Sequence, residues 1–149
     1  MNDIKEHSPD ALEQLTFTLL EAGAMVERRL DRSLSGVRGI SFSEYRLLRE
    51  LSHAHDSALT RVELAQAVGL TPSAVTRALK PLEKLGYIIT IKSERDARKS
   101  LARLTPGGIE LLADAQGVVR DVIASLPLET LKGAGLEAFL QRISSRRSA

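Results

Sequence analysis

The chain has 149 residues, of which 43% are hydrophobic and 27% charged, a composition typical of one soluble globular domain. It has no cysteine, its first residues (Met1 to Pro9) are polar, and no apolar run approaches the ~20 residues that span a bilayer. We therefore expect a cytoplasmic protein without disulfides, a cysteine-bearing zinc site or a thiol redox sensor.

The net charge of +2 is unevenly distributed along the chain. Residues 60–105 contain nine basic and four acidic side chains, so this segment carries +5 and the remainder −3. A basic middle between acidic flanks indicates a polyanion partner for the middle segment. A merely solvated surface would give the same pattern, so charge alone does not decide between the two.

Two helices are predicted in the first third. Pro9 suits the first helical position behind Ser8. Apolar residues then recur at helical spacing, namely Leu12, Leu15, Leu19, Ala22, Val26 and Leu30. The turn-rich segment 33–39 is expected to end this helix. A capping box, in which Ser41 and Glu44 each bond the other's backbone N–H, then opens a helix whose apolar face holds Tyr45, Leu48 and Leu51.

Two shorter helices are predicted next. A polar loop, 52–58, precedes a second capping box at Thr60 and Glu63, and the helix that it opens stops at Gly69. Another helix begins at 71–72 and runs to about residue 85, with Gly86 as a left-handed stop. Pro81 lies inside it and lacks a backbone N–H, so we expect a bend or local break there, with Leu82 and Leu85 still packed.

A β-hairpin and a long helical region complete the chain. Residues 87–91 and 101–104 suit two strands, joined by a charged tip at 92–99. A final helical region opens at 105–106, where Gly107 and Gly108 indicate a flexible start, and is broken at Pro127 and softened at Gly133 and Gly135. The predicted fold is mainly α with a small β-hairpin wing (α+β), a winged helix-turn-helix with N- and C-terminal dimerisation helices.

The two short helices carry the spacing of a helix-turn-helix. Ala65 is small where the first helix must approach the second, Gly69 supplies the positive φ of the turn, and Val75 is a β-branched core residue. The second helix has an apolar stripe of Val75, Ala78, Leu79, Leu82 and Leu85. Its predicted DNA-contacting residues are Thr71, Ser73, Thr76, Arg77 and Lys80. Pro81 makes Lys80 and Lys84 less secure base contacts, and an ordinary amphipathic surface helix is the alternative.

The hairpin tip is the second predicted DNA contact. Arg95, Arg98 and Lys99 at a strand turn can straddle a phosphate backbone, and an arginine can enter a narrow minor groove. Asp96 would repel DNA, so its expected role is to hold Arg98 by a carboxylate–guanidinium pair. The alternative is a turn that only adds solubility.

These motifs resemble the MarR family of bacterial transcriptional regulators. The residues that carry the resemblance are 41–45 with 47, 48 and 51, the helix pair from 64–65 to 85–86, the wing Asp96-Ala97-Arg98, and 104–108. It covers the chain from about Pro9 to Arg142. The resemblance implies an obligate homodimer that binds palindromic operators in double-stranded DNA, often near its own promoter. It also implies that the protein can release DNA when it binds a small aromatic or phenolic compound, as many members of the family do.

The terminal helices are the predicted dimer interface. Apolar residues of the long helix repeat with heptad spacing, at Ile109, Leu112, Gln116 (the one polar member), Val119, Ile123 and Leu126. The last helix has an apolar face of Leu136, Phe139, Leu140 and Ile143. Within one MarR-like chain, 1–149, we assign 41–105 to the DNA-binding lobe and 8–35 and 106–146 to dimerisation. Packing of these helices against each other within one chain is the alternative.

A small aromatic effector would bind where the lobe meets the dimerising helices. Tyr45 offers a flat apolar body with a polar tip, and Arg49, with Arg46 nearby, can meet a carboxylate. The alternative places Tyr45 in the core and both arginines on a solvated helix face.

Other classes of function find little support. His53, His55 and Asp56 include metal-ligand types, but their place in a polar loop favours a solvated turn. The chain has no cysteine nucleophile, no His-Glu-x-x-His and no phosphate-binding Gly-x-x-x-x-Gly-Lys. We therefore predict neither an enzyme nor a cofactor. A winged helix used only for protein–protein docking remains the alternative to DNA binding.

Overall fold

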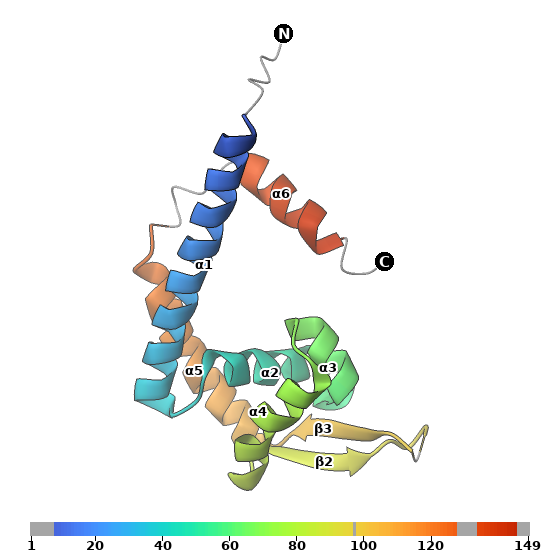
Figure 1. Ribbon diagram of the computed structural model, residues 1–149. Coiled ribbons are helices and arrows are strands. Elements are labelled where there is room, and N and C mark those ends of the chain that lie inside the picture. The colour runs from blue at the N-terminus through green and yellow to red at the C-terminus, as the bar shows by residue number, and fades with distance from the viewer. Residues whose placement is uncertain (1–7, 97, 128–133, 146–149) are drawn as a thin grey trace.

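Helices dominate the chain, as the sequence patterns predict. The structure, a computed structural model, describes residues 8–96, 98–127 and 134–145. These form helices α1 (Pro9–Arg38), α2 (Phe42–His53), α3 (Arg61–Val68), α4 (Pro72–Lys84), α5 (Pro106–Ala124) and α6 (Ala134–Ser145), a 3-10 turn at His55–Ser57, and strands β1 (Ala58–Thr60), β2 (Ile88–Lys92) and β3 (Ser100–Leu104). This arrangement confirms the predicted winged helix-turn-helix with helical extensions (Figure 1).

The first helix is longer than predicted. Segment 33–39 does not end α1, which continues to Arg38 and stops at Gly39, whose φ is +69° and whose N–H donates to the Ser35 carbonyl. Leu34 is fully buried in this last part, so packing outweighs the weak helix propensity of the serines and glycine around it.

Both predicted capping boxes are present. The Glu44 N–H donates to Ser41 Oγ at 3.1 Å, and the Ser41 N–H donates to Glu44 Oε2 at 2.7 Å. The same exchange joins Glu63 and Thr60 at 3.2 and 2.8 Å. Hydrogen bonds from the Thr60 backbone, then from its hydroxyl, and a weaker attraction to Lys99 lower the pKa of Glu63, although partial burial opposes them.

The sheet has one strand more than predicted. Its order is β1-β3-β2, all antiparallel, with Leu59 opposite Ala102 on one side of β3 and Ile88 opposite Leu104 on the other. Strand β1 begins at the end of the predicted loop. It was not predicted because three residues are too few to display the alternation that marks a strand. The turn before it holds Asp56 and Ser57 at positive φ, 56° and 52°.

One hydrophobic core joins the lobe to the extensions. It includes Leu34 from α1, Leu48 and Leu51 from α2, Val75 from α4 and Ala115 from α5. Helix α2 lies at its centre and contacts α1 and α5 as well as α3, α4, β1 and β3. The second half of α1 and α5 are therefore packed onto the winged part of the chain rather than hinged from it.

The inward face of α5 corrects two sequence interpretations. Leu112 and Val119 are buried in the core of the single chain, so only part of the predicted heptad seam is exposed. Gly108 is not a flexible start: it is buried, and a Cβ there would lie 2.1 Å from the Tyr87 carbonyl oxygen. A glycine is therefore needed at this position because the start of α5 packs closely against the turn that follows α4.

The distal helices leave much apolar surface uncovered. The first half of α1 projects away from the winged lobe, and α6 lies apart from that lobe (Figure 1). Their exposed apolar side chains include Leu12, Leu15, Phe17, Leu19 and Leu20 on α1 and Phe139, Leu140 and Ile143 on α6. Of the helices in the described ranges, none has the length and apolar character needed to cross a membrane.

Candidate nucleic-acid interface

The turn between α3 and α4 has the predicted geometry. Gly69 has φ +70°, and its N–H donates to the Ala65 carbonyl, which also accepts from the Leu70 N–H at 3.0 Å. Ala65 is 4% exposed and Val75 is fully buried, and both belong to the core in which α3 contacts α4. This contact fixes α4 on α3 and leaves the opposite face of α4 to solvent.

That exposed face holds the predicted DNA-contacting residues of α4. Thr71 is the N-cap, and its Oγ accepts from the Ala74 N–H at 3.2 Å. The Thr76 hydroxyl donates to the Pro72 carbonyl at 3.0 Å, so its oxygen remains an acceptor while its proton is committed. Ser73, Arg77 and Lys80 are exposed beside them. The arrangement presents hydroxyl and cationic groups, which suit base edges and phosphates.

Pro81 does not break α4. The helix continues to Lys84, and Leu82 is 1% exposed, as predicted. Pro81 and Arg77 are both exposed, so water can satisfy the Arg77 carbonyl that loses its helical donor. The prediction for Leu85 was wrong: it is 64% exposed, because the chain turns at Gly86 (φ +78°) and the helix ends before Leu85 reaches the core.

The wing tip is tied together by short-range hydrogen bonds. The Ser93 N–H donates to the Lys99 carbonyl at 2.9 Å, and Ser93 Oγ accepts from the Arg95 and Asp96 N–H groups at 3.3 Å each. Sequence reasoning gave Ser93 no role. A serine three residues before an aspartate at a strand turn is the signal that could have identified it.

Asp96 and Arg98 form the predicted local pair. Asp96 Oδ1 accepts from the Arg98 backbone N–H at 3.1 Å and lies 3.4 Å from Arg98 Nε. The Arg98 side chain is 93% exposed, so this contact directs it without burying it. Arg95 and Lys99 are also exposed, and residue 97 between the pair lies outside the described residues.

Contacts between distant elements were missed by sequence reasoning. Asp31 Oδ1 on α1 accepts from the Phe42 N–H at 2.9 Å and so binds the first turn of α2. The Arg46 guanidinium donates to the Val68 carbonyl at 2.7 Å, at the C-terminal end of α3. Arg46 therefore supports the helix-turn-helix instead of lying on a solvated face.

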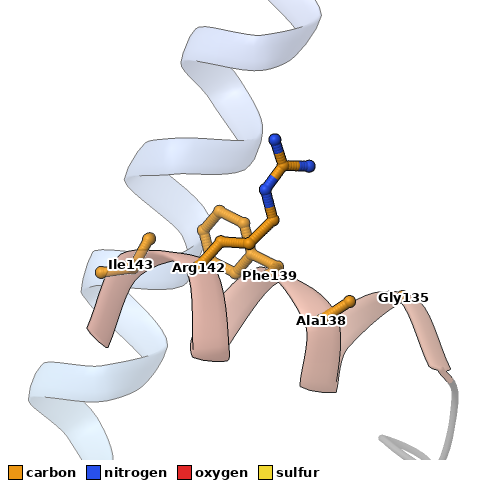
Figure 2. A pocket seen from close by; sticks show the side chains of 5 residues that line it. All are labelled: Gly135, Ala138, Phe139, Arg142 and Ile143. Carbon is orange, nitrogen blue, oxygen red and sulfur yellow. The ribbon is translucent and has the colours of Figure 1, made fainter. Parts of the chain in front are cut away.

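The two candidate effector residues lie in different surroundings. Tyr45 is 7% exposed and its ring stacks on Phe42, with centroids 6.1 Å apart, which places it in the core. Arg49, one helical turn later on α2, is exposed. A separate open hollow of about 340 Å³ lies along one face of α6, lined by Gly135, Ala138, Phe139, Arg142 and Ile143 (Figure 2).

The histidine loop has no geometry that suits a metal. His55 Nδ1 lies 3.1 Å from Asp56 Oδ2, and both side chains are largely exposed. Over 8–96, 98–127 and 134–145, no three histidine or carboxylate side chains come close enough together to hold an ion. The loop fits the solvated turn that its polar composition indicates.

Comparisons with known proteins agree with this architecture. A family model described as "MarR family" matches residues 38–99. The HTH-type transcriptional repressor Rv2887 of Mycobacterium tuberculosis is 32% identical over 106 residues, which are 71% of this chain and 74% of that protein.

Two solved structures extend the similarity to the terminal helices. The transcriptional regulator BldR from Sulfolobus solfataricus has a TM-score of 0.81 and 25% identity, covering 98% of this chain and 99% of its own. Sco3205 from Streptomyces coelicolor, a MarR family regulator solved in complex with DNA, has a TM-score of 0.78 and 28% identity, covering 90% and 87% of the two chains.

Proposed function

The chain belongs to the MarR family of transcriptional regulators, and from this we propose that it is a homodimeric repressor that binds a palindromic DNA operator. The observation that carries the proposal is the exposed polar face of α4 beside a basic wing whose Arg98 is directed by Asp96. The relative Rv2887, named as a repressor, and the DNA-bound structure of Sco3205 support both the function and the partner.

We assign the DNA contacts to two elements. Thr71, Ser73, Thr76, Arg77 and Lys80 of α4 enter the major groove, where hydroxyl and guanidinium groups can bond base edges and phosphates. The wing residues Arg95, Arg98 and Lys99 contact the neighbouring backbone or minor groove. Residues 41–105 are then the DNA-binding lobe of the chain.

Dimerisation is supported by the apolar surface of the terminal helices. Leu15 and Leu20 on α1 and Leu140 on α6 are 61%, 62% and 50% exposed, and Ile109 on α5 is 53% exposed. An apolar surface of this extent indicates a protein partner, and a second copy with two-fold symmetry offers the matching surface. We assign dimerisation to 8–35 and 106–146, except for the face of α5 that is buried within the chain.

Selection of bound sequences from random duplex DNA tests the proposal. We expect a palindrome whose half-sites lie ~10 bp apart, centre to centre, because a two-fold dimer presents two recognition helices about one DNA turn apart. Enrichment of a single half-site would contradict the dimer. No enrichment, together with salt-insensitive binding to a protein, would replace DNA binding by docking.

We also propose that a small aromatic acid or phenol weakens operator binding. Support comes from the place of α2, whose exposed Arg49 lies one turn after the buried Tyr45 and which contacts α1 and α5 as well as the rest of the lobe. A ligand there must prefer the DNA-incompetent arrangement, and a coupling of about 1–3 kcal/mol would change operator affinity about 5- to 150-fold. Titration of salicylate-like acids and phenols into the protein–operator complex tests this, and no change in affinity with any of them would contradict it.

A further inference from the structure

Arg61 joins its own helix to one further helix and to both strands of the wing. It is the first residue of α3, and its Nη2 lies 3.3 Å from Glu83 Oε1 on α4 and 3.1 Å from Thr90 Oγ1 on β2. Its Nη1 lies 3.4 Å from Ser100 Oγ on β3. The Thr90 hydroxyl also donates to Glu83 Oε1, which closes the cluster. We call these four residues, Arg61, Glu83, Thr90 and Ser100, the wing clamp.

The position of Arg61 is not explained by stability of its own helix. A cation in the first turn of a helix is disfavoured by the helix dipole. The Arg61 and Glu83 side chains are only 23% and 29% exposed, so their ion pair is partly shielded from solvent and salt. A planar guanidinium can donate to several acceptors in fixed directions, and here they belong to three other elements.

The clamp reaches the part of the hairpin that the core does not hold. Ile88, Ala102 and Leu104 fix the base of the hairpin, since all three are buried. Ser100 lies opposite Lys92 in the last strand pair before the tip, and Thr90 lies opposite the buried Ala102, where the part of the hairpin held by the core ends. Through Glu83, the clamp joins this outer half to the last turn of α4.

We propose that the wing clamp sets the direction of the wing relative to α4, so that both elements meet DNA in register. Arg61 and Glu83 are then positioning residues for operator recognition, and they act through Arg77 and Arg98 rather than by contacting DNA. The proposal rests on the DNA-binding function proposed above. A wing held in advance does not have to be ordered on binding, which raises affinity where α4 and the wing contact DNA in register, as we propose for the operator.

A direct phosphate contact by Arg61 is the competing explanation, and the two predict opposite effects at Glu83. If Arg61 binds phosphate, Glu83 competes for it, and Glu83→Ala should leave affinity unchanged or raise it. If the clamp positions the wing, Glu83→Ala should impair operator recognition much as Arg61→Ala does.

Binding of wild type, Arg61→Ala, Glu83→Ala and the double variant to operator and to unrelated duplex DNA, across a salt series, tests the clamp. We expect each single variant to lower the ratio of operator to non-specific affinity by about tenfold, and the double variant by no more than either, because residues in one network are not additive. Val62→Ala, at an exposed position next to Arg61 but outside the clamp, should keep the ratio. The charge exchange Arg61→Glu with Glu83→Arg should restore part of the operator preference that each single variant loses.

Stability measurements and a conservative variant keep the test decisive. Thr90→Val removes one hydroxyl from an exposed strand position, preserves shape and β propensity, and should still lower the ratio. A fall in the salt slope of about one for Arg61→Ala alone, with Glu83→Ala unimpaired, would assign Arg61 to phosphate and overturn the clamp. Reduced unfolding stability with an unchanged ratio would overturn it too, while DNA binding would stand. Failure of the wild type to prefer any sequence would instead reject the proposed function.

Discussion

At the scale of single residues, the wing depends on Arg98. Its exposed side chain is directed by Asp96 and carries one of the positive charges at the tip, so it is placed to meet a phosphate or a narrow minor groove. Arg98→Ala should weaken binding to many sequences and lower the salt slope by about one. Fluorescence anisotropy with several duplexes across a salt series measures both. Glu94→Ala, at an exposed acidic position of the same tip, should not weaken binding; equal slopes for wild type and Arg98→Ala would remove the wing from the mechanism.

Arg77 should behave differently because it lies on the recognition helix. Its side chain is on the exposed face of α4, where a guanidinium can bond guanine O6 and N7. Arg77→Ala should therefore relax the preference at one or two base pairs, at a cost of about 1–3 kcal/mol for the preferred sequence. Leu85→Ala, at the exposed C-cap of the same helix, is the control and should leave base preference intact. A loss that is uniform across operator variants would show that Arg77 contacts only phosphate.

At the scale of elements, the start of α5 depends on a glycine. A Cβ at Gly108 would lie 2.1 Å from the Tyr87 carbonyl oxygen and 2.9 Å from Leu104 Cδ2, so Gly108→Ala must push the helix away from the end of α4 and the sheet. Overpacking of this kind costs about 1–3 kcal/mol. Urea unfolding at one fixed protein concentration measures the loss.

Gly107→Ala is the matched control for Gly108→Ala. Its Cβ would meet nothing closer than 3.8 Å, so the higher helix propensity of alanine should make this change neutral or stabilising. Similar losses at both positions would show that flexibility of the helix start, rather than close packing, explains the glycines.

The elements also show what a sequence can and cannot predict. Caps were predicted correctly because Ser41, Thr60 and Gly69 act on residues within a few positions of themselves. The far end of α1 and strand β1 were missed because tertiary packing, rather than local pattern, decides them. The same limit applies to the candidate interface: the Asp96–Arg98 pair spans two positions and was predicted, whereas Arg61 and Ser100 are 39 positions apart and share no motif.

At the scale of the whole molecule, the hydrophobic core and the exposed apolar surface have separate roles. The core joins α5 and the second half of α1 to α2, which belongs to the lobe 41–105, so a change at the proposed dimer interface should leave the lobe folded. Leu140 on α6 is 50% exposed and belongs to the surface that we assign to the partner. Glutamate there would place two charges at a two-fold interface, where desolvation and their mutual repulsion both oppose association.

Leu140→Glu should therefore convert a dimer into a folded monomer. Light scattering should give twice the chain mass for wild type at micromolar concentration and a single chain mass for the variant, with the helical circular dichroism of the lobe retained. Operator affinity should fall toward that of one half-site, because the linked second half-site then no longer contributes. Gln141→Glu adds the same charge at the next exposed position, outside the apolar face, and should remain dimeric. A wild-type chain that is monomeric at micromolar concentration would reject the dimer, and α1, α5 and α6 would then have to cover their apolar faces within one chain.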